Sequence, residues 1–298
     1  MAFDKSRLID LDECVLNALE LFIRTLLPHP DLGEFTKPLV LGSGNAAATG
    51  RVMFADREAV FADEGSYKAK LSSVSGINGA VLISASGGKH APVIAEDLRA
   101  RGIKTILLTN NPDAPAGKFV SKTYVFPKNP EPYTYNTSTY LGLILSKTGE
   151  RPGKILDHIQ KIRAAVPENL SSYSAYYLLV PETYDVVREM FQTKFDELFG
   201  PMVTARVFTP EQTKHAKTVV SSDRELFISF GCQNDLFGTQ RLFIPLPENV
   251  GFGAVLAVGY YIIGHIQKQH PPYFKDSIQA YTKMASKVFN QTITPITE

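Results

Sequence analysis

The residues best suited to chemistry form a serine- and glycine-rich segment, Ser84–Lys89, which reads Ser-Ala-Ser-Gly-Gly-Lys. It follows the apolar run Ala80–Ile83, which is typical of a strand buried on both faces, and a helical pattern begins after Pro92. Such a loop is suited to bind an anion, because glycines let the backbone approach the ligand and the helix N-terminus carries positive charge. Ser84 and Ser86 add hydroxyl donors. The segment predicts an anion site, although it also fits an ordinary turn with a serine cap.

Two further segments have similar chemistry. Gly42–Asn45 (Gly-Ser-Gly-Asn) follows the apolar run Pro38–Leu41, and Thr137–Thr139 (Thr-Ser-Thr) begins an apolar helical pattern. Ligands of open α/β sheets bind at the carboxyl ends of the strands, where parallel topology brings such loops together. Hydroxyl-rich helix starts are commonly only caps. Three of them in one α/β unit nevertheless favour a phosphate monoester as the ligand.

The elements that must position these loops alternate between strand and helix. Strand-like runs occur at 38–41, 59–62, 80–83, 105–108 and 122–126, after an amphipathic helical pattern over 8–27. The pattern resumes at 175–180, 202–208, 225–230 and 241–244, beyond the charged, turn-rich segment 148–153. It predicts doubly wound parallel sheets with helices on both faces. We therefore expect an α/β protein of two similar domains, residues 1–150 and 151–298.

Composition narrows the classes of function. The 298 residues include 31 Lys and Arg against 30 Asp and Glu, a net charge of +1, which does not favour nucleic acid. Cys14 and Cys232 lie far apart in the sequence, with no metal-type spacing, as is usual in a reducing compartment. No stretch reaches the roughly 18 apolar residues that a membrane span needs. We expect a soluble, cytoplasmic protein without a metal, a nucleic-acid partner or a membrane partner.

The order of the segments Gly42–Asn45, Ser84–Gly88 and Thr137–Thr139 resembles the sugar isomerase (SIS) domain superfamily. The repeated α/β pattern is similar to the small phosphoglucose/phosphomannose isomerases of that superfamily. The resemblance implies two tandem flavodoxin-like, SIS-type domains. It also implies an isomerase that converts a sugar 6-phosphate from aldose to ketose through an enediolate, as a homodimer with no cofactor.

In that family the loop after the third strand reads Ser-x-Ser-Gly-x-Thr and binds the sugar phosphate. Lys89 stands here in place of the threonine, and an ammonium group can also bind a phosphate. The resemblance implies that the phosphate ligands are Ser43, Ser84, Ser86, Gly87, Gly88, Lys89, Thr137 and Ser138, and that Gly44 and Asn45 contact the rest of the substrate.

Proton transfer is expected from Glu211 and His215, because the family takes a glutamate and a histidine from its second domain. The two residues are four apart in a predicted helix over 210–219 and would share one face. The isomerases have Gln-x-Asn-Glu-Asn-Ala-Lys here, and alignment on Ala216 and Lys217 puts Lys214 or His215 where the glutamate should be. Three interpretations stay open: catalytic groups, a solvated surface pair, or a sugar-phosphate binding or sensing protein that has lost the base.

A nicotinamide dehydrogenase is the remaining alternative. Gly42, Gly44 and Ala47 match the looser dinucleotide fingerprint, and Asp63 follows at the end of the second predicted strand. This interpretation explains the first loop but gives Ser84–Gly88 no special task. We therefore prefer the sugar phosphate as the ligand.

Overall fold

The computed structural model of the protein describes residues 3–297. Its contacts define two compact units, each built on its own parallel sheet. The first-sheet unit comprises Leu21–Lys128 and Ser138–Gly149. The second-sheet unit comprises the chain up to Glu20, Asn129–Thr137 and the chain from Glu150 onward. The expected α/β fold with parallel sheets is confirmed.

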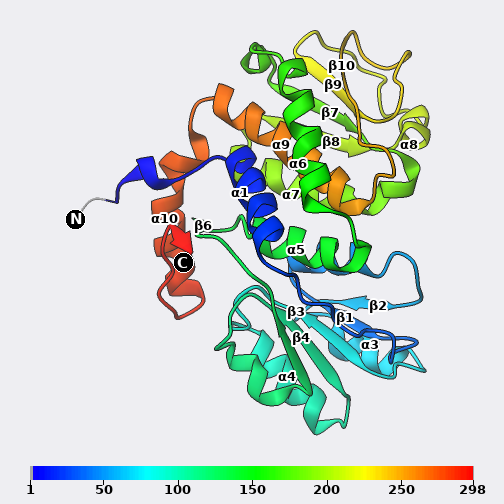
Figure 1. Ribbon diagram of the computed structural model, residues 1–298, viewed down its shortest axis with the longest axis vertical. Coiled ribbons are helices and arrows are strands. Elements are labelled where there is room, and N and C mark those ends of the chain that lie inside the picture. Colours follow the sequence, from blue (N-terminus) through cyan, green and yellow to red (C-terminus); the bar gives the residue numbers. More distant parts are fainter. Residues whose placement is uncertain (1–2, 298) are drawn as a thin grey trace. The chain divides into compact units, whose positions relative to one another are not determined.

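The first-sheet unit holds five parallel strands in the order β2-β1-β3-β4-β5 (Figure 1). Every residue of the three central strands is buried, as their apolar runs indicated, whereas the edge strand β5 is partly exposed. The strands are β1 (Leu39–Leu41), β2 (Val60–Ala62), β3 (Ala80–Ile83), β4 (Thr105–Thr109) and β5 (Lys122–Val125).

Helices connect these strands. The element α1 (Leu11–Arg24) continues from the second-sheet unit into this one, and α5 begins at Thr137, the last residue of a second-sheet segment. Gly44, with φ +53°, caps α2, which begins within the glycine-rich stretch that the sequence pattern placed before the helix. The remaining elements are α2 (Asn45–Met53), α3 (Tyr67–Ser73), α4 (Ala91–Ala100), α5 (Thr137–Thr148) and the 3-10 helix η2 (Pro115–Phe119).

The second-sheet unit holds four parallel strands in the order β10-β9-β7-β8. Numbered from β7, this order is the same as that of the first four strands of the other sheet. A short antiparallel pair joins residues that are far apart in the sequence. The strands are β7 (Ala175–Leu179), β8 (Thr204–Phe208), β9 (Glu225–Phe230) and β10 (Gln240–Ile244), and the pair is β6 (Glu131–Pro132) with β11 (Ile296–Thr297).

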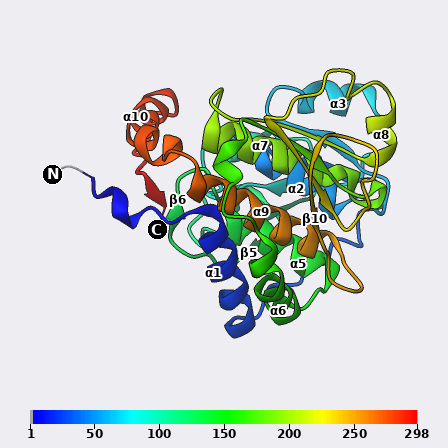
Figure 2. The same cartoon turned by 90° about the horizontal axis from the view of Figure 1, so that it is seen from above.

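Helix α7 packs against β8 and α9 in this unit (Figures 1 and 2). Gly259 allows the contact, since a Cβ there would lie 2.1 Å from the ring of Phe191. The helices are α6 (Pro152–Ile162), α7 (Arg188–Phe199), α8 (Pro210–Lys214), α9 (Phe252–Gln269) and α10 (Tyr273–Val288), with 3-10 helices η1 (Lys5–Arg7), η3 (Arg163–Ala165), η4 (Leu170–Ser172) and η5 (Glu182–Val187).

The prediction of a helix over 210–219 is wrong in its extent, because α8 ends after one turn at Lys214. Thr209 and Gln212 form a capping box at its start. His215 then leaves the helical conformation with ψ 61°, and Ala216 has φ +60°. The apolar residues that suggested a longer helix include Val219, which is 81% exposed, so no buried face holds further turns together.

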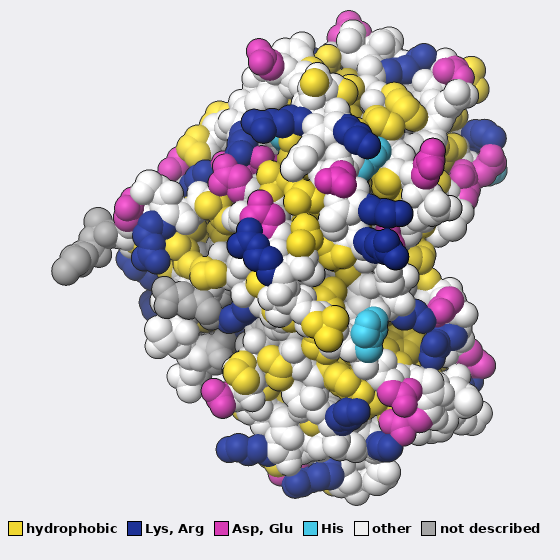
Figure 3. Space-filling model, in the orientation of Figure 1, with side chains coloured by type: hydrophobic (Ala, Val, Ile, Leu, Met, Phe, Trp, Pro, Cys, Tyr) yellow, Lys and Arg dark blue, Asp and Glu magenta, His cyan; other side chains and the backbone are white. Residues whose placement is uncertain are grey.

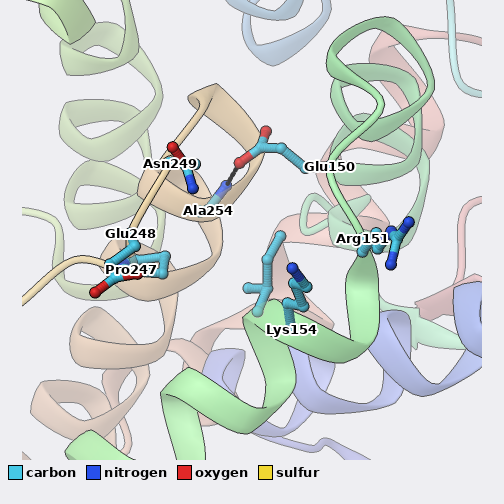
Figure 4. A pocket seen from close by; sticks show the side chains of 8 residues that line it. Glu150, Arg151, Lys154, Pro247, Glu248, Asn249 and Ala254 are labelled. Atoms are coloured by element: carbon cyan, nitrogen blue, oxygen red, sulfur yellow. Dashed lines mark hydrogen bonds between the residues drawn. The ribbon is translucent and has the colours of Figure 1, made fainter.

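The N-terminus of α9 is occupied by a carboxylate from another segment (Figure 4). Glu150 accepts hydrogen bonds from the backbone N–H groups of Gly251 at 2.8 Å, Gly253 at 2.7 Å and Ala254 at 3.0 Å. A cavity of about 320 Å³ adjoins it. Because the protein's own carboxylate satisfies these donors, this helix end is not left for an external anion.

The surface mixes charges of both signs. Lys and Arg side chains are interspersed with Asp and Glu side chains over the face shown in Figure 3, in keeping with the net charge of +1. Among residues 3–297, no helix combines the length and the apolar character needed to cross a bilayer.

Candidate functional site

The carboxyl ends of β1 and β3 form the switch point of the first sheet. The chain leaves β1 through α2 toward β2 on one side, and leaves β3 through α4 toward β4 on the other. Open α/β sheets bind their ligands at this point, because the two connections diverge there. The segments Gly42–Asn45 and Ser84–Lys89 are the ones that follow β1 and β3. The structure therefore brings two of the three predicted loops to one sheet edge.

The serines of the second loop have hydroxyl protons to offer. Ser84 Oγ accepts the N–H of Gly87 at 3.2 Å, and Ser86 Oγ accepts the N–H of Gly88 at 3.3 Å. Neither hydroxyl donates a hydrogen bond to another residue in the described part of the chain. A hydroxyl that accepts from the backbone and still carries an unused proton is suited to bind an anion.

The backbone of this loop is held by the last residue of β4 and by the segment that follows it. Thr109 Oγ1 donates to the carbonyl of Ala85 at 2.8 Å, and Asn111 Nδ2 donates to the carbonyl of Ser86 at 3.0 Å. Gly87 has φ +61°, and a Cβ on it would lie 2.4 Å from Cβ of Ala114. The loop is therefore fixed before any ligand binds, as a precise anion site requires.

Lys89 and His90 separate the loop from α4. Lys89 is exposed and adopts the left-handed conformation with φ +53°, and His90 is the N-cap residue, without a side-chain hydrogen bond to the helix. Pro92 lies in the first turn, where its missing N–H costs nothing. The helix thus begins at Ala91, a few residues beyond the serines.

The first loop has a different hydrogen-bond pattern. Ser43 Oγ donates to a carboxylate oxygen of Glu64, which follows β2. Gly44 has φ +53°, and a Cβ built on it would meet nothing within 4 Å. Asn45 is buried as the first residue of α2. While Ser43 holds Glu64, its hydroxyl can accept a hydrogen bond from a ligand but has no proton left to donate.

The third predicted segment is the first turn of α5. Within the second-sheet unit, Thr137 N–H donates to the buried carboxylate of Glu131 at 2.5 Å. Within the first-sheet unit, Asn110 Nδ2 donates to Thr139 Oγ1 at 2.6 Å. Ser138 is buried. Thr137 Oγ1 is buried and has no hydrogen-bond partner in the described chain, so its hydroxyl proton can still be donated to a ligand.

The sequence pattern did not indicate a buried lysine that is bonded to the loop preceding this turn. The Lys194 side chain has 0% exposure and forms an ion pair of 2.6 Å with Glu197, whose side chain is 20% exposed. Lys194 Nζ also donates to the carbonyls of Thr134 at 3.3 Å and Tyr135 at 3.1 Å. A fully buried ammonium is rare unless it is paired and hydrogen-bonded, and Lys194 meets both conditions.

The loop that Lys194 holds is itself unusual. Thr134 and Asn136 have positive φ angles of 85° and 45°, and Thr134 Oγ1 is buried without a hydrogen-bond partner in the described chain. Backbone strain of this kind persists only where surrounding contacts impose it.

The sequence did contain one indication that Lys194 is buried. It occupies an apolar position in the helical period of α7, whose buried residues include Met190, Phe191, Phe195 and Leu198.

Glu211 and His215 lie in solvent. The Glu211 side chain is 62% exposed and pairs with Lys214 at 2.5 Å, and its N–H donates to a Glu182 carboxylate oxygen at 3.1 Å. His215 is exposed and stands past the end of α8, so the two side chains do not share a helical face as predicted. Their proposed role in proton transfer stays a prediction.

Asp63, the acidic residue of the dinucleotide alternative, has a local structural task. Its carboxylate accepts hydrogen bonds from Ser66 Oγ at 2.7 Å, from Ser66 N–H at 2.9 Å and from Gly65 N–H at 3.1 Å. The Ser66 hydroxyl contributes most to lowering the pKa of this carboxyl. Asp63 thus organises the turn into α3, which gives a structural reason for its position.

Comparison with known proteins shows likeness in structure rather than in sequence. No family model matches the chain, and no curated protein sequence matches it. Glucosamine-6-phosphate deaminase from Thermotoga maritima superposes with a TM-score of 0.65 at 16% identity, over 86% of this chain and 92% of that one. The C-terminal domain of glucosamine-fructose-6-phosphate aminotransferase from Francisella tularensis gives 0.64 at 10% identity, over 90% and 98%.

Tagatose-6-phosphate ketose/aldose isomerase from Escherichia coli gives a TM-score of 0.59 at 13% identity, over 89% of each chain. At such identities the likeness establishes the fold alone. The protein therefore has an α/β fold with parallel sheets that is similar to the fold of these proteins, and the superpositions extend over most of its length.

Proposed function

We propose that the protein binds a sugar 6-phosphate and isomerises it between aldose and ketose. The observation that carries the proposal is the pair of serine hydroxyls, Ser84 and Ser86, on a rigid loop at the switch point of the first sheet. Proteins of the same fold are named for acting on glucosamine 6-phosphate and tagatose 6-phosphate, which supports a phosphorylated sugar as the ligand.

Hydroxyl, backbone and ammonium groups from these loops would hold the phosphate. Ser84 and Ser86 supply hydroxyl protons, and the Gly87–Gly88 backbone and the Lys89 ammonium complete the loop. Thr137, whose buried hydroxyl has no partner in the described chain, and Ser138 supply the third segment. Ser43 would be a further phosphate ligand once its hydroxyl releases Glu64, and Gly44 and Asn45 would contact the remainder of the substrate. We also propose two SIS-type domains divided near residue 150, a homodimer and a cytoplasmic location.

Isomerisation needs a carboxylate that moves the proton between C1 and C2. Glu197 is one candidate, because its partly exposed carboxylate pairs with the buried ammonium of Lys194. Glu211 with His215 is the other candidate, and the exposure of the Glu211 side chain to solvent is the argument against it. A base must be held in place to transfer a carbon-bound proton efficiently.

Incorporation of solvent deuterium at C1 of fructose 6-phosphate or at C2 of glucose 6-phosphate in D2O, followed by NMR, tests this assignment. Glu197→Gln should slow incorporation by at least about 100-fold with sugar-phosphate affinity retained. Glu248→Gln, a matched change of an exposed carboxylate in the same unit, should have no effect. Loss of deuterium incorporation in Glu211→Gln but not in Glu197→Gln would assign the proton transfer to Glu211. Full incorporation in both variants would show that neither carboxylate is the base.

A sugar-phosphate binding or sensing protein is the second candidate. The position of Glu211 favours this function, because its side chain is exposed and paired with Lys214. His215 lies past the end of α8, so the two side chains do not share a helix face. Tight binding of a sugar phosphate by the wild type without any deuterium incorporation would select this function.

A further inference from the structure

The second sheet ends one strand earlier than the first. In the first sheet, β5 pairs with the outer side of the fourth strand, β4. Counted from β7, the fourth strand of the second sheet is β10, and among residues 3–297 no strand pairs with its outer side (Figure 1). Such an edge strand presents backbone N–H and C=O groups with which another strand can pair. The second-sheet unit therefore has an open edge at β10.

One hydrogen bond shows which backbone groups of β10 point to the open edge. The N–H of Gly231, the residue after β9, donates to the carbonyl of Ile244 at 2.9 Å, so Ile244 faces β9. Successive residues of a strand direct their N–H and C=O groups to alternate sides, so Leu242 also faces β9. Arg241 and Phe243 consequently direct theirs away from β9, toward the open edge.

The side chains of the same two residues are exposed. Phe243 is 51% exposed, and Arg241 is exposed as well. Arg241 Nε donates to the carbonyls of Phe237 at 2.9 Å and Gly238 at 2.8 Å, which holds the guanidinium beside the strand. Because residues two apart in a strand share a face, the edge presents a cation and an aromatic ring on one face.

These features make the edge complementary to itself. When two copies of β10 pair in antiparallel fashion about a twofold axis at Leu242, Arg241 of each copy lies opposite Phe243 of the other. Both residues face the open edge, so each such pair exchanges N–H···O=C hydrogen bonds in both directions. Each arginine then meets an aromatic ring, which is favourable, and not a second arginine, which would be repelled.

We propose that two copies of the protein associate through their β10 strands, which joins their four-stranded sheets into one continuous sheet. The inference rests on the homodimer of the proposed function and names its contact surface. The register makes the contact specific in charge. A carboxylate at position 243 would face Arg241 of the other copy and be attracted, whereas a cation at position 243 would face the same arginine and be repelled.

Sedimentation velocity over a wide range of protein concentrations, which gives the dissociation constant of the dimer, tests the proposal. Phe243→Arg should raise this constant about tenfold, because two symmetry-related pairs of like charge then lie across the contact. Phe243→Glu should leave it within about twofold, because an ion pair replaces each contact of the ring. Met284→Arg, the matched change at a 54% exposed apolar residue of α10, should have no effect.

An unchanged dissociation constant in Phe243→Arg, or equal weakening by Phe243→Arg and Phe243→Glu, would overturn the pairing of β10 and leave the proposed function standing. A wild type that is monomeric at every concentration would overturn both this inference and the proposed homodimer, and would assign Arg241 the role of a charge that protects the edge. Calorimetric titration of the same samples with glucose 6-phosphate tests the sugar-phosphate function separately, since its failure would contradict that function and not the dimer contact.

Discussion

Gly87 is the residue on which the conformation of the Ser84–Lys89 loop most directly depends. Its φ of +61° and the 2.4 Å approach of a Cβ to Ala114 mean that Gly87→Ala meets both backbone strain and a steric overlap. We expect a loss of about 3 kcal/mol in the free energy of unfolding, together with loss of phosphate binding. Urea denaturation and calorimetry measure the two effects.

Gly102→Ala is the matched control for this change. Gly102 also has a positive φ, +71°, but a Cβ there would meet nothing within 4 Å. It should therefore cost only about 1 kcal/mol and leave ligand binding intact. Equal effects of the two substitutions would show that the loop does not depend on close packing against Ala114.

At the scale of single residues, the sequence indicated candidate ligand residues better than it indicated their hydrogen-bond partners. Ser84 and Ser86 could be singled out because their spacing in a strand–loop–helix pattern has a direct chemical meaning. The bond from Ser43 to Glu64 could not be foreseen, because it depends on the pairing of β1 with β2. Lys194 was missed because a lysine within a helical pattern ordinarily lies in solvent, whereas here it is buried.

At the scale of elements, central strands were the most predictable. The apolar run 80–83 coincides with β3, as expected for a strand buried on both faces. The strand predicted at 225–230 coincides with β9, in which the polar residues Glu225 and Ser229 are buried as well. Short helices were less predictable. Helix α8 ends where Ala216 adopts a left-handed conformation, and Val219 beyond it is exposed and does not pack against the core. The hydrophobic periodicity of the sequence predicts neither feature.

Helix α9 carries a titratable group whose burial predicts a pH dependence. His265 Nε2 is buried without a hydrogen-bond partner in the described chain, and 3.9 Å separates it from Asp12 Oδ2. Burial lowers the pKa of His265, partly opposed by Asp12 and assisted by Lys268 and Arg163. The unfolded chain therefore takes up this proton at a higher pH than the folded protein does.

Stability should consequently fall as the pH is lowered below about 6.5, the ordinary pKa of histidine. Burial lowers the pKa of His270 as well, so both histidines act in the same direction. Urea denaturation between about pH 8 and pH 5 measures the slope. His265→Gln should make the slope shallower, and an unchanged slope in this variant would contradict the assignment.

At the scale of the whole molecule, the sequence showed the repetition of strands and helices, and the structure adds the matching strand order of the two sheets. Periodicity could not show that the chain up to Glu20 and Asn129–Thr137 group with the second sheet. That grouping rests on contacts between distant residues, such as the pairing of β6 with β11 and the bonds from Lys194 to the 134–135 carbonyls.

Titration of the intact protein with a sugar phosphate, read as a change in unfolding free energy, tests the central claim most directly. Glucose 6-phosphate and fructose 6-phosphate are the ligands, with NAD as a comparison. Binding to the folded state adds about 2.7 kcal/mol at a hundredfold excess over Kd. We predict this gain for the wild type and for Ser72→Ala, an exposed serine on α3, and its loss in Ser84→Ala/Ser86→Ala. An undiminished gain in the double variant, or a gain with NAD alone, would contradict the account.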